Sequence, residues 1–130
     1  MIASVGRRVL VVDDDADFSL LLVEVLETIG IVATSAKNGR DALDQLRRGP
    51  RPNAIVLDLM MPEMDGWEFR RQQRMLPDLA SIPVVVLSAD GHIADAASGF
   101  GADGFVLKPP TLDTLVSEIE RVLARAPLFA

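Results

Sequence analysis

The stretch at residues 9–29 reads VLVVDDDADFSLLLVEVLETI and joins two kinds of pattern. It begins with a short apolar run, which is typical of a strand buried on both faces of a parallel sheet. It continues with apolar residues at helical spacing, namely Phe18, Leu21, Leu22, Val25, Leu26 and Ile29. Between the two stand consecutive aspartates, which repel one another and stay ionised only beside water or a counter-charge. The stretch therefore predicts a strand, a group of negatively charged side chains and an amphipathic helix, in that order.

The same alternation continues along the chain. The apolar runs predict strands at Val9–Val12, Ile31–Ala33, Ile55–Leu57, Val84–Leu87 and Phe105–Leu107. Helical patterns lie between them; the clearest follows Thr111, its expected N-cap, and weaker ones cover 42–46, 66–76 and 92–100. Alternating strands and helices predict an α/β protein whose parallel sheet has helices on both faces. We therefore expect a flavodoxin-like (βα)5 three-layer sandwich, with a five-stranded parallel sheet of order 2-1-3-4-5.

The composition is that of an ordinary globular domain, with 130 residues, 49% of them hydrophobic and 25% charged. The absence of cysteine excludes disulfides and cysteine-based metal sites, and it fits a cytoplasmic protein. The net charge of −6 argues against direct nucleic-acid binding, and no apolar run approaches the ~18 residues of a membrane span. The arginines at 70, 71 and 74 are interpreted as a solvated helix face. We expect one domain at 7–126 and a short tail at 127–130.

Distinctive polar side chains follow four of the five expected strands. The strand ends carry Asp13–Asp15, Asp58, Ser88 and Lys108. Because parallel strands all end at the same edge of a sheet, where ligands bind, these side chains are expected to meet. Carboxylates suit a hard divalent cation, Mg²⁺ or Mn²⁺, and a carboxylate can also accept a phosphoryl group. The set therefore predicts phosphoryl transfer to Asp58, with a metal and Lys108 neutralising the charge and Ser88 binding a phosphoryl oxygen.

Four motifs stand at these strand ends: VVDDD at 11–15, DLMMPEMDG at 58–66, LSA at 87–89 and KP at 108–109. Together they make the sequence resemble the receiver domain of bacterial two-component response regulators, in the single-domain, chemotaxis-receiver-like form. The resemblance implies that Asp58 is the phospho-acceptor and that Asp14 binds the metal directly. It implies that Asp13 acts largely through water, and that Met60 offers its backbone carbonyl to the metal.

The resemblance also assigns a conformational switch. Ser88 matches the family's serine or threonine switch position, and Phe105 its aromatic switch position. Lys108 matches the lysine whose bond to the following proline is usually cis in the family. Phe105 replaces the commoner tyrosine and Ser88 the commoner threonine. A switch at Phe105 therefore has no phenolic hydrogen bond.

The function implied by the resemblance is signalling by a phospho-acceptor and not by an enzyme, apart from self-catalysed phosphotransfer and autodephosphorylation. A sensor histidine kinase or a histidine phosphotransfer protein would supply the phosphoryl group. The switch would then alter the face formed by the fourth and fifth strands and the helices after them, which binds a downstream protein. We expect no membrane or direct nucleic-acid contact, and a monomer or a phosphorylation-dependent dimer. Without a further domain the output would be protein–protein contact, unless the chain is a piece of a longer protein.

Other interpretations stay open at this point. Asp13-x-Asp15 also fits the D-x-D motif of Mg²⁺-dependent phosphatases of the haloacid-dehalogenase type, although that class leaves DLMMPEMDG unexplained. A pseudo-receiver would bind partners without phosphorylation. An FMN-binding flavodoxin is disfavoured because aspartates after the first strand would repel the phosphate. Asp15 is interpreted as the start of the first helix, and Gly66 as a residue that permits a tight backbone before the third.

Overall fold

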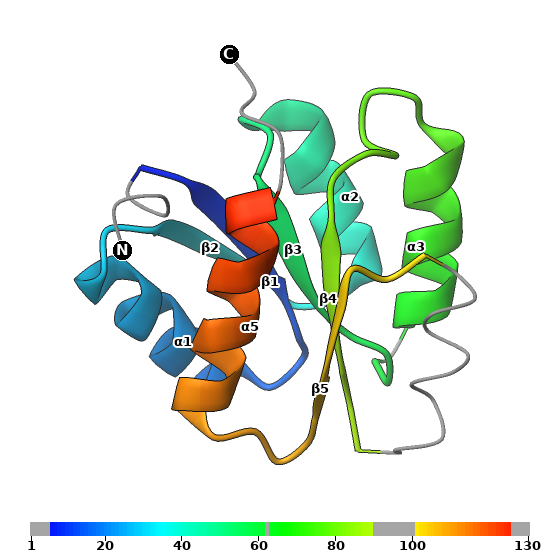
Figure 1. The fold of residues 1–130 in the computed structure, drawn as a ribbon. Coiled ribbons are helices and arrows are strands. Elements are labelled where there is room, and N and C mark those ends of the chain that lie inside the picture. Colours follow the sequence, from blue (N-terminus) through cyan, green and yellow to red (C-terminus); the bar gives the residue numbers. More distant parts are fainter. Residues whose placement is uncertain (1–5, 62, 90–100, 126–130) are drawn as a thin grey trace.

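The computed structural model describes residues 6–61, 63–89 and 101–125, and its elements alternate as the sequence predicts (Figure 1). In chain order they are β1 (Arg8–Val12), α1 (Ala16–Thr28), β2 (Val32–Ala36), α2 (Gly39–Arg48), β3 (Ala54–Asp58), α3 (Gly66–Met75), β4 (Val84–Ser88), β5 (Gly104–Leu107) and α5 (Leu112–Arg125). All strand pairs are parallel, and the sheet order β2-β1-β3-β4-β5 confirms the prediction. The helix expected at 92–100 lies outside the described residues.

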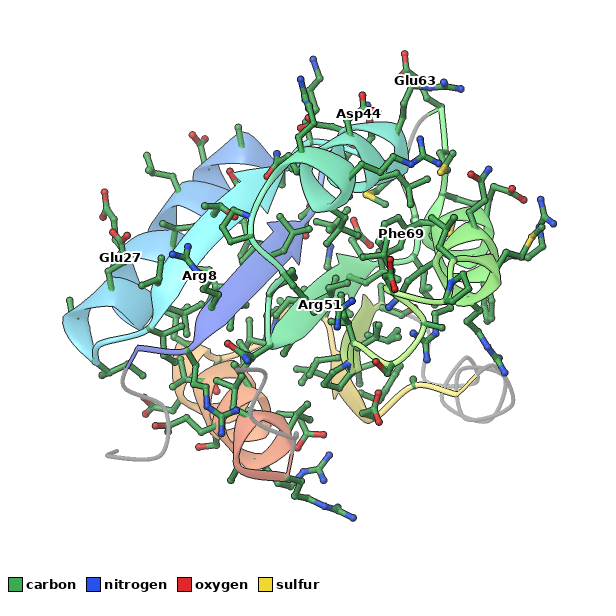
Figure 2. The ribbon with its side chains drawn as sticks, turned by 90° about the horizontal axis from the view of Figure 1, so that it is seen from above. Arg8, Glu27, Asp44, Arg51, Glu63 and Phe69 are labelled. Carbon is green, nitrogen blue, oxygen red and sulfur yellow. The ribbon has the colours of Figure 1, made fainter. Side chains whose placement is uncertain are left out.

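The sheet separates two apolar cores, because successive side chains of a strand point to opposite faces. In β1, Val9 and Val11 face the core formed with α1 and α5, whereas Leu10 and Val12 face the core formed with α2 and α3. Figure 1 shows these two helix pairs on opposite faces of the sheet, and Figure 2 shows Phe69 of α3 inside the second core. Each fully buried side chain of this kind contributes about 1.5–3 kcal/mol relative to an exposed one.

Helix starts follow the polar residues that the sequence places before them. Asp15 is the N-cap of α1, as predicted, and its carboxylate accepts from the amide of Phe18 at 3.1 Å. Asn38 and Asp65 cap α2 and α3 in the same way. Thr111 accepts from the amide of Thr114 at 3.1 Å at the start of α5, as expected. These side chains satisfy amide groups that the first turn of a helix leaves unbonded, and they fix where each loop at this edge ends.

Three predictions about local structure are wrong. The second strand spans Val32–Ala36 and not 31–33; it is an edge strand, and its exposed Thr34 and Ser35 interrupt the apolar pattern that marks a buried strand. Leu21, assigned to the buried stripe of α1, is 47% exposed, because that helix buries only Ser19, Leu22 and Leu26. The arginine group on α3 is not uniformly solvated, because Arg70 is 5% exposed and packs inside the fold.

Candidate functional site

The strand register brings the predicted polar side chains to one edge of the sheet. Val12 pairs with Leu57, so Asp13 and Asp58 end neighbouring strands. The amide of Lys108 donates to the carbonyl of Ser88 at 2.8 Å, which holds the end of β5 beside the end of β4. One carboxylate oxygen each of Asp13, Asp14 and Asp58 lies within 4.8 Å of the others. The three aspartates form the acidic cluster, the name we use below for Asp13, Asp14 and Asp58.

Lys108 closes the acidic cluster from the β5 side. Its Nζ lies 3.3 Å from Oδ2 of Asp13 and 3.2 Å from Oδ2 of Asp58. Burial disfavours the charged lysine, but the charges of Asp13 and Asp58 outweigh it and raise the pKa of Lys108. The side chain of Lys108 is therefore protonated and positively charged at neutral pH. Three carboxylates against one ammonium still leave an excess of negative charge at this edge.

The two buried carboxylates of the acidic cluster accept hydrogen bonds from different backbone amides. Asp13, 2% exposed, accepts from the amide of Asp15 through Oδ1 at 2.9 Å and faces Lys108 through Oδ2. Burial, with the nearby charge of Asp58, raises the pKa of Asp13 against the opposing effects of the Asp15 amide and Lys108. Asp58, 3% exposed, accepts from the amide of Met60 at 3.1 Å. Both carboxylates are thus oriented before any ligand arrives.

Asp14 differs from its neighbours because it is exposed. Within the described part of the chain its carboxylate has no hydrogen-bond or ion-pair partner, and one of its oxygens lies near those of Asp13 and Asp58. The cluster therefore combines two fixed, buried carboxylates with one accessible carboxylate. An oxygen-rich, net negative arrangement of this kind fits a hard divalent cation that keeps some of its water.

Gly66 holds the loop after Asp58 close to the strand end. A Cβ atom at this position would lie 2.7 Å from the carbonyl oxygen of Asp58 and 2.7 Å from Cα of Leu59. The backbone here is therefore as tight as the sequence predicts. Its amide donates to the carbonyl of Leu59 at 3.0 Å. Any larger residue would push this turn away from β3. The glycine therefore fixes the backbone that carries Asp58 and Met60.

A second loop supports the same turn, and the sequence pattern did not reveal it. Asn38 is 6% exposed; its Nδ2 donates to Oε2 of Glu63 at 3.0 Å. Glu63 has φ = 66°, a left-handed conformation that costs a non-glycine residue roughly 1 kcal/mol or more. The amide of Gly39 donates to the carbonyl of Met64 at 3.3 Å. The start of α2 and the loop after β3 are therefore linked.

The remaining predicted positions lie around the cluster. Ser88 is 1% exposed at the end of β4, and the Lys108–Pro109 bond is cis, as the family resemblance implied. Met60 is 70% exposed, and its backbone amide contacts Asp58. Phe105 is partly buried and packs against the core beneath α2 and α3. Phe105 therefore contacts the apolar core.

A sheet of this order with an acidic cluster and a lysine at its carboxyl edge defines a receiver-type α/β signalling domain. The family model described as "Response regulator receiver domain" matches residues 9–120. The chain belongs to this family.

Individual relatives agree with the family match. The response regulator MprA of Mycolicibacterium vanbaalenii is 39% identical over 120 residues, which cover 91% of this chain and 51% of the relative. The Francisella response regulator 1452 receiver domain is 29% identical with a TM-score of 0.83, covering 92% of this chain and 98% of that one. CheY4 of Vibrio cholerae is 29% identical with a TM-score of 0.82, covering 89% and 98%. The chain spans about half the length of the curated relatives it matches. None of the helices in the described ranges is long and apolar enough to cross a bilayer.

Proposed function

We propose that this protein is the phosphoryl-accepting receiver of a two-component phosphorelay and that Asp58 is the acceptor. The observation that carries the proposal is the position of Asp58: buried at the end of the central strand β3, 3.2 Å from the Lys108 ammonium and within the acidic cluster. A sensor histidine kinase or a histidine phosphotransfer protein supplies the phosphoryl group. Family membership and the relatives named as response regulators support this choice of donor.

The acidic cluster fits Mg²⁺, or Mn²⁺ in its place. Asp14 and Asp58 would hold the cation through carboxylate oxygens, and Met60 would add its backbone carbonyl, as the family resemblance implies. Asp13, held by the Asp15 amide and Lys108, would act on the metal through water, as the family resemblance implies. When bound, the cation neutralises the charge that builds up on the phosphoryl oxygens.

The chain's own residues then perform the transfer. One oxygen of Asp58 is held by the Met60 amide and the other faces Lys108, so the carboxylate meets the phosphorus in a fixed orientation. As the Asp58 oxygen–phosphorus bond forms, the phosphorus–nitrogen bond of the donor phosphohistidine breaks, and the histidine nitrogen keeps the electron pair. Lys108 pairs with a phosphoryl oxygen that arrives beside it.

The phosphoryl group changes the local charge, and the switch follows from that change. The Ser88 hydroxyl, at the end of β4, moves to donate a hydrogen bond to a phosphoryl oxygen. Phe105 then turns toward the space that the movement of Ser88 opens. The affected face includes β4, β5 and α5; the helix expected at 92–100, which the family would add to it, lies outside the described residues. This face binds a downstream protein target, and it can also support a dimer that depends on phosphorylation.

Intact-mass measurement tests the acceptor. The protein is incubated with acetyl phosphate and Mg²⁺, and we expect one phosphoryl adduct that does not form with EDTA and is absent from Asp58→Asn. Asp44→Asn is the matched control, because Asp44 lies exposed on α2 outside the cluster (Figure 2), and it should keep the adduct. An adduct that survives in Asp58→Asn and disappears in Asp13→Asn would instead indicate the phosphatase alternative. No adduct with any donor would indicate a pseudo-receiver.

A further inference from the structure

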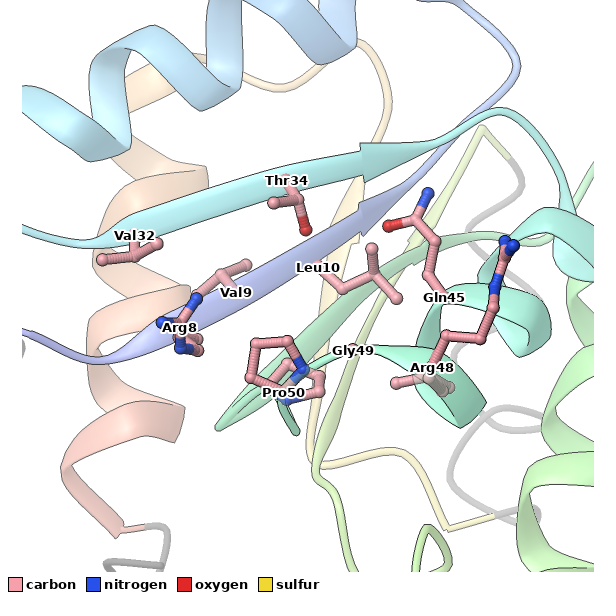
Figure 3. A pocket seen from close by; sticks show the side chains of 11 residues that line it. Arg8, Val9, Leu10, Val32, Thr34, Gln45, Arg48, Gly49 and Pro50 are labelled. Carbon is pink, nitrogen blue, oxygen red and sulfur yellow. The ribbon is translucent and has the colours of Figure 1, made fainter.

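A second concave site lies at the opposite edge of the sheet from the acidic cluster. This α2–β1 pocket has a volume of about 250 Å³ and is formed by the first residues of β1 and β2 and by the end of α2 with the loop after it. Its lining includes Arg8, Leu10, Thr34, Gln45, Arg48 and Pro50 (Figure 3). The proposed phosphorylation does not use any of these residues.

The pocket exists because α2 ends before it covers the start of the sheet. Arg8 pairs with Val32 and Leu10 with Thr34, so these side chains share the face on which α2 packs. The helix ends at Arg48, and the proline-containing loop turns away toward β3. Val32 is 40% exposed at this edge, and Leu10, only 3% exposed, lies at the apolar floor of the pocket. An apolar floor of this kind is a candidate surface for a ligand.

The polar groups around the floor have unused bonding capacity. Gln45 donates through Nε2 to the carbonyl of Ser35 at 2.8 Å, which leaves its side-chain oxygen as a free acceptor within the described part of the chain. The Thr34 hydroxyl has no hydrogen-bond partner among the described residues. Figure 3 shows both oxygens on the same side of Leu10. One acceptor and one hydroxyl therefore border the apolar floor.

The charge of the lining is opposite to that of the whole protein. Arg8 and Arg48 lie at the two ends of the pocket (Figure 3), and none of the described residues that line it is acidic, although the net charge of the chain is −6. Arg48 bonds the carbonyl of Asp44 through Nε at 3.2 Å, so its terminal nitrogens stay available. Guanidinium groups bind carboxylates with two parallel hydrogen bonds. The pocket thus complements an anion with an apolar body.

We propose that the α2–β1 pocket binds a small amphipathic carboxylate. Its ring or branched chain packs on Leu10 and Pro50, its carboxylate pairs with a guanidinium at one end, and a hydroxyl or N–H donates to Gln45. The pocket is smaller than the roughly 300–1,000 Å³ of a drug-sized site, which favours a compact molecule over a peptide. The proposal is independent of phosphorylation at Asp58.

An NMR titration of the full chain with 4-hydroxybenzoate tests this ligand class. We expect saturable amide shifts at Leu10, Thr34 and Gln45, with an affinity on the order of 0.1–1 mM, because so few atoms make contact. Binding of 4-hydroxybenzamide, which has the same ring without the negative charge, should be at least about 5-fold weaker. Equal affinity for the two molecules would overturn the proposal, as would shifts located at the acidic cluster or spread over the surface.

Variants distinguish binding in the α2–β1 pocket from attraction of the ligand to general surface charge. Arg8→Ala or Arg48→Ala should weaken 4-hydroxybenzoate binding by about 5-fold or more, and the affected residue identifies the carboxylate end. Arg47→Ala is the matched control, because Arg47 is exposed on the same turn of α2 and does not line the pocket. Val32→Phe adds bulk at the edge strand and should abolish the shifts in a protein whose thermal unfolding stays cooperative. Unchanged binding in both arginine variants and in Val32→Phe would refute the site.

Discussion

Among the described residues, charged side chains are buried in two places, and the surroundings of the charge differ between them. At the carboxyl edge of the sheet, Asp13 and Asp58 share one lysine, and an excess of negative charge remains. On α3, Arg70 is similarly buried, but its guanidinium donates to the side-chain oxygen of Gln73 and to the carbonyl of Gly101, both at 2.8 Å. Burial alone therefore does not mark a functional site; several like charges buried together around too few counter-charges do.

Arg70 and Gln73 form a hydrogen-bonded network, which we call the α3 network, and its contacts are structural. Gln73, itself fully buried, donates through Nε2 to the carbonyl of Leu79 at 2.8 Å and to that of Ile82 at 3.1 Å. Together Arg70 and Gln73 tie α3 to the segments that lead into β4 and β5. Burial lowers the pKa of Arg70 against the opposing charge of Asp103, and the guanidinium remains ionised at every pH at which the protein folds. We therefore expect the α3 network to stabilise the folded protein and the metal-free acidic cluster to destabilise it.

Removing the buried cation should have the largest effect on stability. Arg70→Ala is expected to lower the free energy of unfolding by about 3 kcal/mol, because it leaves the Gln73 and Gly101 oxygens without this donor and removes packed side-chain carbon. Urea unfolding measures the change. The folded fraction should still accept phosphate from acetyl phosphate, because Arg70 lies outside the acidic cluster. Unchanged stability would contradict the structural role of Arg70, and so would loss of phosphorylation in folded protein.

Neutralising one member of the acidic cluster should act in the opposite direction. Asp13→Asn is expected to weaken Mg²⁺ binding by about 10- to 100-fold, or about 1.4–2.7 kcal/mol, as loss of an indirect ligand does. In the absence of metal the same variant should be more stable than the wild type, because a buried carboxylate beside Asp58 is gone. Calorimetric Mg²⁺ titration and urea unfolding with EDTA measure the two effects. A metal-free variant that is less stable than the wild type would contradict the interpretation of the cluster as uncompensated charge.

The sequence predicted the acidic cluster better than it predicted the α3 network, for a physical reason. Parallel strands end at one edge, so Asp13, Asp58 and Lys108 had to converge once the alternation was recognised. Burial of Arg70 depends on which side of α3 meets its neighbours, and a polar side chain on a helix gives no periodic sign of this. The contact between Asn38 and Glu63 joins two loops and requires φ = 66° at Glu63, which local sequence does not specify. Edge strand β2 was misplaced because its exposed face is polar.

The raised pKa of Asp13 makes a smaller, pH-dependent prediction. Between the reference value of 3.8 and this raised pKa the folded protein binds more protons than the unfolded chain. The contribution of Asp13 to metal-free stability is therefore fully present below 3.8 and is lost as the pH rises through the raised pKa. Urea unfolding at several pH values should show this loss in the wild type and not in Asp13→Asn. Mg²⁺ affinity should fall as the pH falls through the same range, because protons compete for the carboxylate.

The smallest effect is expected one residue from the largest. Arg71 follows Arg70 on α3, but its side chain is 62% exposed and pairs with Glu68 at 2.6 Å. The hydrogen bonds from Arg71 and Gln72 lower the pKa of Glu68, yet solvent screens an exposed pair so strongly that its loss changes stability little. Arg71→Ala should leave the midpoint of urea unfolding unchanged within error. The two variants remove the same guanidinium from adjacent positions of one helix, so they differ mainly in burial. An Arg71→Ala protein as unstable as Arg70→Ala would mean that helix charge, and not the buried network, accounts for the difference.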